Sequence, residues 1–175
     1  MMRRKGLFLA CALLLACYDL SQAAGTKINT SDWRVLTLPE CGIRLKLPRR
    51  YLEKHWAVTD GDPIGRSFRG TAFERIDIEV QPSPHGKLAD NKTIRQRDYE
   101  GYTESTETIG GREAILQSFR GGGVIIGGGG QSTTYHAGAI WQLRPGQVLS
   151  IGGDVATPQA QREVLAALRT VEFLP

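Results

Sequence analysis

Residues 133–174 read TTYHAGAIWQLRPGQVLSIGGDVATPQAQREVLAALRTVEFL, and this stretch decides the fold. Two apolar runs, at 139–143 and 148–151, flank Arg-Pro-Gly-Gln. Proline fixes its own φ near −65° and glycine accepts a positive φ, so Pro145-Gly146 indicates a chain reversal. The stretch therefore predicts two antiparallel strands joined by a turn.

The register of this hairpin follows from the turn. An L-proline does not supply the positive φ of the two-residue primed turns, so we expect a slightly longer loop, for example three residues at 145–147. That loop sets Leu143 opposite Leu149 and Trp141 opposite Ile151. All four side chains then share one buried face, which a slip of one residue would destroy.

A short helix follows the hairpin. Thr157 has the residue type of an N-cap, and Pro158 suits the first helical position. Val164, Leu165 and Leu168 form one apolar stripe at helical spacing. A helix of this length is marginal alone, so it is expected to pack on a sheet, before a last strand or an apolar cap at 171–174.

Two further strands alternate apolar and charged residues, at 43–47 and 76–80. If they are neighbours, Arg44 and Lys46 pair with Asp77 and Glu79 on the wet face. Weaker patterns predict strands at 64–69 and 114–119, a helical turn within 49–56, and a second helix over 91–102. Strands outnumber helices without regular alternation. We therefore expect an α+β fold, a mainly antiparallel sheet flanked by two or so helices, in a single domain at 33–175.

The first 24 residues have the pattern of a secretory signal: a basic start, then an apolar segment at 7–16 too short to span a membrane. Two processing sites compete. Leu14-Leu15-Ala16-Cys17 resembles a bacterial lipobox, in which Cys17 becomes the lipidated first residue. The alternative is a cut after Ala23 that releases a soluble protein. Residues 25–32 read as a polar tether.

Charge and location follow from this signal. With cleavage before Cys17, Arg3, Arg4 and Lys5 leave with it, so the net charge falls from +4 to +1. No basic block remains to indicate nucleic-acid binding. The sequence predicts a periplasm-facing lipoprotein held in the membrane through Cys17, because each buried methylene of an acyl chain contributes about 0.8 kcal/mol. The alternative location is soluble, either periplasmic or secreted.

The glycine tract GGGVIIGGGG at 121–130 is the most unusual composition in the chain. A phosphate-binding loop needs a helix after it, whereas the following residues read as a strand. We expect a flexible hairpin loop with Val124, Ile125 and Ile126 as its apolar tip. This tip either contacts a partner or a membrane, or folds back over the sheet edge.

No catalytic constellation emerges, and no metal or cofactor is predicted. His55, His85 and His136 lack metal-ligand spacing, and no serine lies in a G-x-S-x-G context. Cys41 reads as a small apolar filler. One candidate ligand cleft is formed by Tyr99, Tyr102, Tyr135 and His136.

Four segments carry a family resemblance: CGIRLKLPRRY at 41–51, IGGREAILQSF at 109–119, the IWQL…VLSIGG hairpin, and the terminal REVLAALRTVEF. In this order the chain resembles the PsbP/DcrB-like α+β sandwich group over 41–174. The long glycine insertion departs from the usual tight connection. The resemblance implies a non-enzymatic binding and assembly module, with no shared catalytic residues to carry over.

The leading functional hypothesis is therefore an exported, lipid-anchored, non-enzymatic accessory or assembly module of the cell envelope that binds another envelope or exported protein. The first alternative is a periplasmic immunity or inhibitor protein that neutralises a toxin or hydrolase. The second is a small-molecule-binding domain that uses the tyrosine and histidine cleft.

Overall fold

The computed structural model describes residues 28–54, 64–71, 73–82, 99–126 and 130–175. They form a three-stranded sheet in the order β1-β2-β10 and a seven-stranded sheet in the order β3-β4-β5-β9-β8-β7-β6. Every strand pair is antiparallel. The elements are β1 (Arg34–Leu38), a 3-10 turn (Pro39–Cys41), β2 (Ile43–Leu47), β3 (Leu52–Lys54), β4 (Ile64–Arg69), β5 (Arg75–Pro82), β6 (Glu100–Ile109), β7 (Arg112–Ile126), β8 (Gly130–Arg144), β9 (Gln147–Val155), α3 (Pro158–Leu168) and β10 (Glu172–Phe173).

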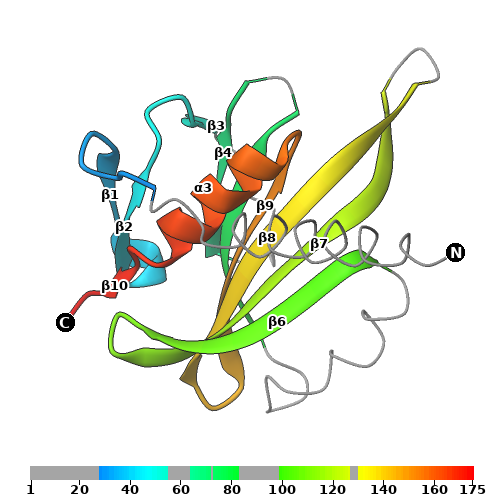
Figure 1. Cartoon of the computed structure of the whole chain (residues 1–175). Helices are drawn as coiled ribbons and strands as arrows, with labels where there is room; N and C mark the ends of the chain where they lie inside the picture. Colours follow the sequence, from blue (N-terminus) through cyan, green and yellow to red (C-terminus); the bar gives the residue numbers. More distant parts are fainter. Residues whose placement is uncertain (1–27, 55–63, 72, 83–98, 127–129) are drawn as a thin grey trace, which may run out of the picture.

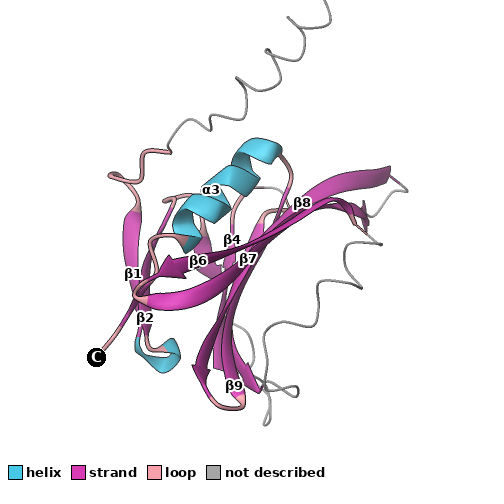
Figure 2. Cartoon of the chain, turned by 60° about the horizontal axis from the view of Figure 1, so that its bottom comes forward, coloured by secondary structure: helices cyan, strands magenta, loops and turns pink. Residues whose placement is uncertain are grey.

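The small sheet and α3 lie on the same face of the large sheet, so the described part of the chain forms a single-domain sandwich (Figures 1 and 2). One hydrophobic core fills the space between the layers. Its large, fully buried side chains from the large sheet include Phe68, Ile76, Ile78, Trp141, Leu149 and Ile151. The small sheet and the helix add Ile43, Leu45, Leu47, Val164 and Leu168. We call the opposite face of the seven-stranded sheet the outer face.

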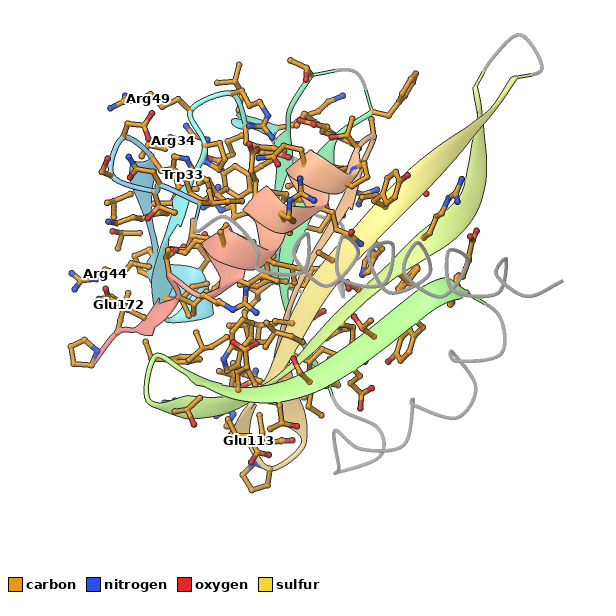
Figure 3. The ribbon with its side chains drawn as sticks, in the orientation of Figure 1. Trp33, Arg34, Arg44, Arg49, Glu113 and Glu172 are labelled. Atoms are coloured by element: carbon orange, nitrogen blue, oxygen red, sulfur yellow. The ribbon has the colours of Figure 1, made fainter. Side chains whose placement is uncertain are left out.

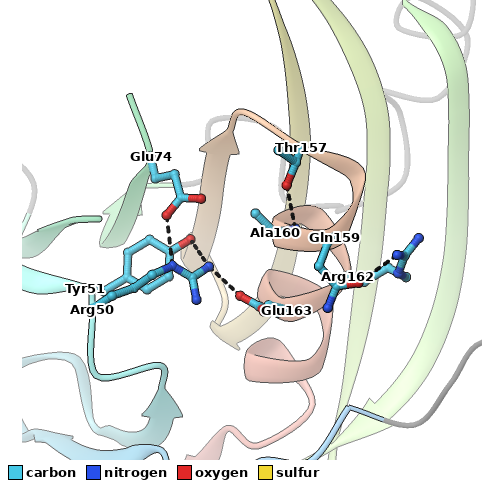
Figure 4. Close-up of polar contacts among 8 residues, drawn as sticks. All are labelled: Arg50, Tyr51, Glu74, Thr157, Gln159, Ala160, Arg162 and Glu163. Atoms are coloured by element: carbon cyan, nitrogen blue, oxygen red, sulfur yellow. Dashed lines mark hydrogen bonds and ion pairs between the residues drawn. The ribbon is translucent and has the colours of Figure 1, made fainter. Parts of the chain in front are cut away.

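The C-terminal helix begins as predicted. Thr157 is its N-cap, and the Thr157 hydroxyl accepts a hydrogen bond from the Ala160 amide at 3.1 Å (Figure 4). Val164 and Leu168 are buried, and Leu165 packs against the core at its margin. In the described part of the chain, no helix has the length and apolar content needed to cross a membrane.

The expectation of two or so helices is wrong for the described residues, which contain one α-helix. Residues 91–98 lie outside the description, while Glu100–Tyr102 begin β6 instead of ending a helix. The helical turn expected at 49–56 is a turn at Arg49 and Arg50 followed by β3. Threonine recurs along β6, and β-branched residues favour extended backbone over helix.

Strands β2 and β5 are not neighbours, which corrects the predicted charge pairing. They lie in different sheets, and their apolar faces meet the same core from opposite sides. Their charged faces therefore point apart. Arg44 instead pairs with Glu172 on β10, with Nε to Oε2 at 2.6 Å, and Asp77 pairs with Arg75 on its own strand.

The β8–β9 turn is shorter than predicted. Arg144 pairs with Gln147 across a two-residue turn in which Gly146 has a φ of 76°, as a type II turn requires. The register of the two strands shifts between Gln142 and Arg144, and this irregularity lets a turn whose twist differs from that of the strands join them. Trp141 therefore lies opposite Leu149 rather than Ile151. Because the predicted register is wrong by two residues, an even number, the predicted side chains stay on the core face of the sheet. Leu143, however, is only half-buried.

Candidate functional site

The most prominent feature is a two-stranded arm at residues 121–134, where β7 and β8 continue past their neighbours. Pairing of β6 with β7 ends at Glu100 opposite Arg120, and pairing of β8 with β9 ends at Tyr135 opposite Val155. Beyond these points the described parts of β7 and β8 pair only with each other. Figure 1 shows this arm projecting from the body of the molecule.

The arm corrects the expectation of a flexible glycine loop. Val124, Ile125 and Ile126 belong to β7, with Val124 opposite Ser132 and Ile126 opposite Gly130. The predicted hairpin is confirmed, but the apolar triplet is strand backbone and not its tip; residues 127–129 lie outside the description. β-Branched residues favour an extended backbone, and a register shift between Gly121 and Val124 absorbs the preceding glycines.

An aromatic cluster lies on the outer face at the base of the arm. Phe119 stacks on Tyr99 with ring centroids 4.2 Å apart, and on His136 at 4.5 Å. Tyr102 lies 6.2 Å from the same ring. Three of the four predicted cleft residues are thus brought together, with Phe119 at their centre.

The fourth predicted cleft residue, Tyr135, belongs to the other face. It packs against the core, because successive side chains of a strand point to opposite faces. The sequence did not indicate that Phe119 belongs to this cluster, because a single aromatic residue in an apolar strand is normally interpreted as part of the hydrophobic core. The cross-strand pairing of Phe119 with His136 that reveals its role is not visible in the sequence.

His136 is held in a fixed orientation by a carboxylate. Its Nδ1 lies 2.9 Å from an oxygen of Asp154, the residue opposite it on β9. The hydrogen bond from His136 lowers the pKa of Asp154, although burial opposes this shift. An ionised carboxylate only accepts hydrogen bonds, so Nδ1 carries the proton and Nε2 is the ring's remaining polar atom.

The imidazole lies flat over two glycines. A Cβ added at Gly138 would come within 3.1 Å of Nε2 of His136, and one added at Gly152 would meet the ring at 3.4 Å. Gln161 on α3 supports the strands from behind, because its side-chain amide donates to the carbonyl of Phe119 at 3.2 Å and to that of His136 at 2.7 Å. The base of the arm is therefore tied to the helix.

A second polar cluster, centred on Arg50, is structural in character. Arg50 donates from Nε to the Glu74 carboxylate at 3.0 Å and forms an ion pair with Glu163 on α3 (Figure 4). Burial disfavours the charged guanidinium, but the hydrogen bonds with Glu163 and Glu74 dominate and raise the pKa of Arg50. The cluster joins three segments distant in sequence: the turn before β3, the turn before β5, and the helix.

The remaining candidates for chemistry are the Cys41 thiol, groups of metal-ligating side chains, and the predicted lipidation residue. Cys41 is buried, and this burial together with the nearby Glu40 carboxylate raises the pKa of its thiol to about 11, so it stays protonated at neutral pH. Among the described residues, no three His, Cys, Asp or Glu side chains gather where they could hold a metal ion. The predicted lipidation residue Cys17, together with His55 and His85, lies outside the described residues.

Comparisons with known proteins bear on the fold. No family model matches the chain, and no curated protein matches its sequence. The solution structure of the cyanobacterial PsbP (CyanoP) of Synechocystis sp. PCC 6803 is similar, with a TM-score of 0.54 and 9% identity over 87% of this chain and 99% of that one. A crystal structure from Bacteroides thetaiotaomicron VPI-5482 aligns with a TM-score of 0.48 and 15% identity, over 82% of this chain and 49% of that one. The chain therefore has a PsbP-like fold, as its sequence motifs predicted.

Proposed function

We propose that this chain is a non-enzymatic accessory module of the bacterial cell envelope that binds another protein through its arm. The observation that carries the proposal is the arm itself. A two-stranded ribbon is marginal in water when nothing packs beside it, and among the described residues each strand of the arm pairs only with the other, so its second edge has no described neighbour. A partner that covers or extends the ribbon would supply the missing stabilisation.

The PsbP-like fold supports this proposal, because the sequence resemblance to that group implies binding and assembly roles rather than catalysis. The described residues also bring no nucleophile, base and orienting group together in the manner of a catalytic triad. Among the described residues, the hydrogen-bond partner of the His136 ring is the Asp154 carboxylate at Nδ1, which orients the ring.

The proposed location follows from the N-terminal sequence. The chain is exported by its first 24 residues and anchored through acyl chains on Cys17. Intact mass of the cellular protein tests this step. A mass beginning at a lipidated Cys17 is expected, whereas a form beginning at Ala24 makes it a soluble exported protein.

A matched pair of variants tests the role of the arm. In the first, a two-residue Asn-Gly turn replaces residues 121–134 and joins Arg120 directly to Tyr135, which already lie opposite each other. In the control, Val35→Thr alters an exposed apolar residue of β1, on the small sheet. Both are purified in mild detergent after expression of the full chain, with thermal unfolding as a check on folding.

The proposal predicts one stoichiometric partner with the parent chain and with Val35→Thr, and none with the shortened arm. Equal recovery of that partner by a folded arm-shortened variant would contradict it. The immunity or inhibitor alternative uses the same arm but predicts loss of neutralisation of a toxin encoded beside this gene. That assay separates the two roles.

A further inference from the structure

Trp33 lies directly before β1, at one end of the sandwich, and a guanidinium lies beside it. Arg49, from the turn before β3, donates from Nε to the carbonyl of Asp32 at 3.0 Å. Figure 3 shows Trp33 and Arg49 at the same end of the molecule, far from Glu113. The Trp33 indole packs partly against the core and is half-buried, whereas Arg49 is exposed. This end therefore combines an available cation with an aromatic ring at the surface.

Two exposed apolar side chains lie at the same end. Leu52 begins β3 and is 64% exposed, and it pairs with Arg69, the last residue of β4. Phe73 is 48% exposed in the turn between β4 and β5. The hydrogen bond from Arg50 to Glu74 ties this turn to the one before β3. The side chains that these contacts bring to one end define a surface that we call the entry face: Trp33, Arg49, Leu52, Arg69 and Phe73.

The exposed charges of the entry face are mainly positive. Arg49 and Arg69 are both exposed, and none of the ion pairs among the described residues includes either of them. The exposed Asp32 offsets one of the two charges, while the Arg50 cluster behind them is internally paired. A weakly basic surface with aromatic and aliphatic side chains complements the boundary between anionic headgroups and acyl chains.

The chain before Trp33 brings this face close to a membrane. Residues 18–32 connect Cys17 to the entry face, and a link of this length spans about 50 Å at most when fully extended. Each cation near an anionic bilayer strengthens binding only about fivefold, so two of them do not hold a free protein there. A tether raises the effective concentration of the face at the bilayer to the millimolar range, and a weak surface then suffices.

We propose that the entry face docks on the anionic phospholipid surface to which the chain is anchored. Arg49 and Arg69 contact the headgroup phosphates, and the indole lies at the boundary between water and lipid. Leu52 and Phe73 enter the region between headgroups and acyl chains. This inference rests on the proposed anchor at Cys17, and it adds that the anchored domain presents one fixed side to the membrane.

An NBD fluorophore on the full, natively processed chain tests the proposal, because its emission reports the polarity around it. The label is carried by Thr71→Cys, in the turn that holds Phe73, or by Glu113→Cys at the opposite end (Figure 3); both positions are exposed, and Cys41 is buried. The chain is reconstituted into vesicles of phosphatidylcholine alone, or of phosphatidylcholine and phosphatidylglycerol in equal parts. We expect a blue shift from position 71 on the anionic vesicles, reversed by added salt, and none from position 113.

Variants separate charge from apolar contact. Arg49→Ala combined with Arg69→Ala should lower the docking equilibrium about 25-fold, at about fivefold for each cation. The matched control, Arg144→Ala, removes an exposed arginine at the β8–β9 turn and should dock normally. Phe73→Ser should weaken docking on both kinds of vesicle without changing its dependence on salt. Thermal unfolding checks that each variant is folded.

Intact mass separates this inference from the anchor on which it rests. A chain that begins at Ala24 has no anchor, and the proposed anchoring and this inference then fail together. With acyl chains on Cys17, equal emission from positions 71 and 113, or unchanged docking by the folded double-arginine variant, overturns this inference alone. A blue shift from position 71 that needs native membranes and is absent on lipid vesicles assigns the entry face to a protein partner, which also overturns the proposal.

Discussion

Replacing Arg50 by alanine should destabilise the protein more than any exposed ion-pair substitution. Arg50 holds two carboxylates, and its removal leaves Glu74, whose side chain is 8% exposed, without its counter-charge. Breaking a buried ion pair from one side costs about 3–5 kcal/mol. Arg50 is itself 31% exposed and Glu163 is 20% exposed, so the lower end of that range, about 3 kcal/mol, is expected.

Urea denaturation measures this loss. With a slope of about 2 kcal/mol per molar urea, a loss of about 3 kcal/mol lowers the unfolding midpoint by about 1.5 M. The matched control is Arg44→Ala, which breaks the Arg44–Glu172 pair, whose side chains are 54% and 57% exposed. Exposed pairs contribute about 0–1 kcal/mol, so that midpoint should move by less than about 0.5 M.

A second variant separates charge from packing. Arg50→Met combined with Glu74→Gln removes both charges of the more deeply buried pair and should recover part of the lost stability, because the carboxylate that still lacks its partner, Glu163, is 20% exposed against 8% for Glu74. If Arg50→Ala and Arg44→Ala shift the midpoint equally, the burial of the Arg50 cluster has no energetic role and the reasoning fails.

Three further predictions concern single groups. The bidentate contact with Arg169 lowers the pKa of Glu107 below its ordinary value of 4.5. The Arg169–Glu107 pair therefore contributes to the free energy of unfolding above that pH, and this contribution is lost as the pH falls through the folded pKa. The stability difference between the parent chain and Arg169→Met should therefore be full at pH 7 and shrink as the pH is lowered below 4.5 in urea titrations; a constant difference would contradict this. Thr157→Ala should cost about 1 kcal/mol by calorimetry, because the Ala160 amide loses its cap, and Thr157→Ser should not. Iodoacetamide should modify Cys41 only after unfolding, as followed by mass; rapid labelling of the native protein would show that the thiol is neither buried nor protonated.

Local rules predicted the elements whose partners are near in sequence. The Thr157-Pro158 helix start and the alternating strands at 43–47 and 76–80 are found where expected, because capping and alternation are decided within a few residues. The Pro145-Gly146 reversal was also right. Its exact register failed because a bulge near Gln142 permits the shorter turn, and bulges leave no clear sequence signal.

The assignment of strands to sheets and the contacts across strands could not be predicted from the sequence. The assignment of β2 and β5 to opposite sheets depends on which apolar faces meet, and both strands have the same alternating pattern. Of the four residues assigned to a cleft from the sequence, Tyr99, Tyr102 and His136 stack on Phe119, while Tyr135 packs against the core. Their true centre, Phe119, and the His136–Asp154 contact follow from cross-strand register, which single-strand patterns do not specify.

Photo-crosslinking in intact cells tests most directly whether this protein works by contact through its arm. A benzophenone amino acid placed at Ile125, within the arm, is compared with the same group at Val35 on the small sheet. We predict one discrete protein adduct from position 125, lost when cells lack that partner, and none from position 35. Free monomer at both positions under native expression would contradict the account.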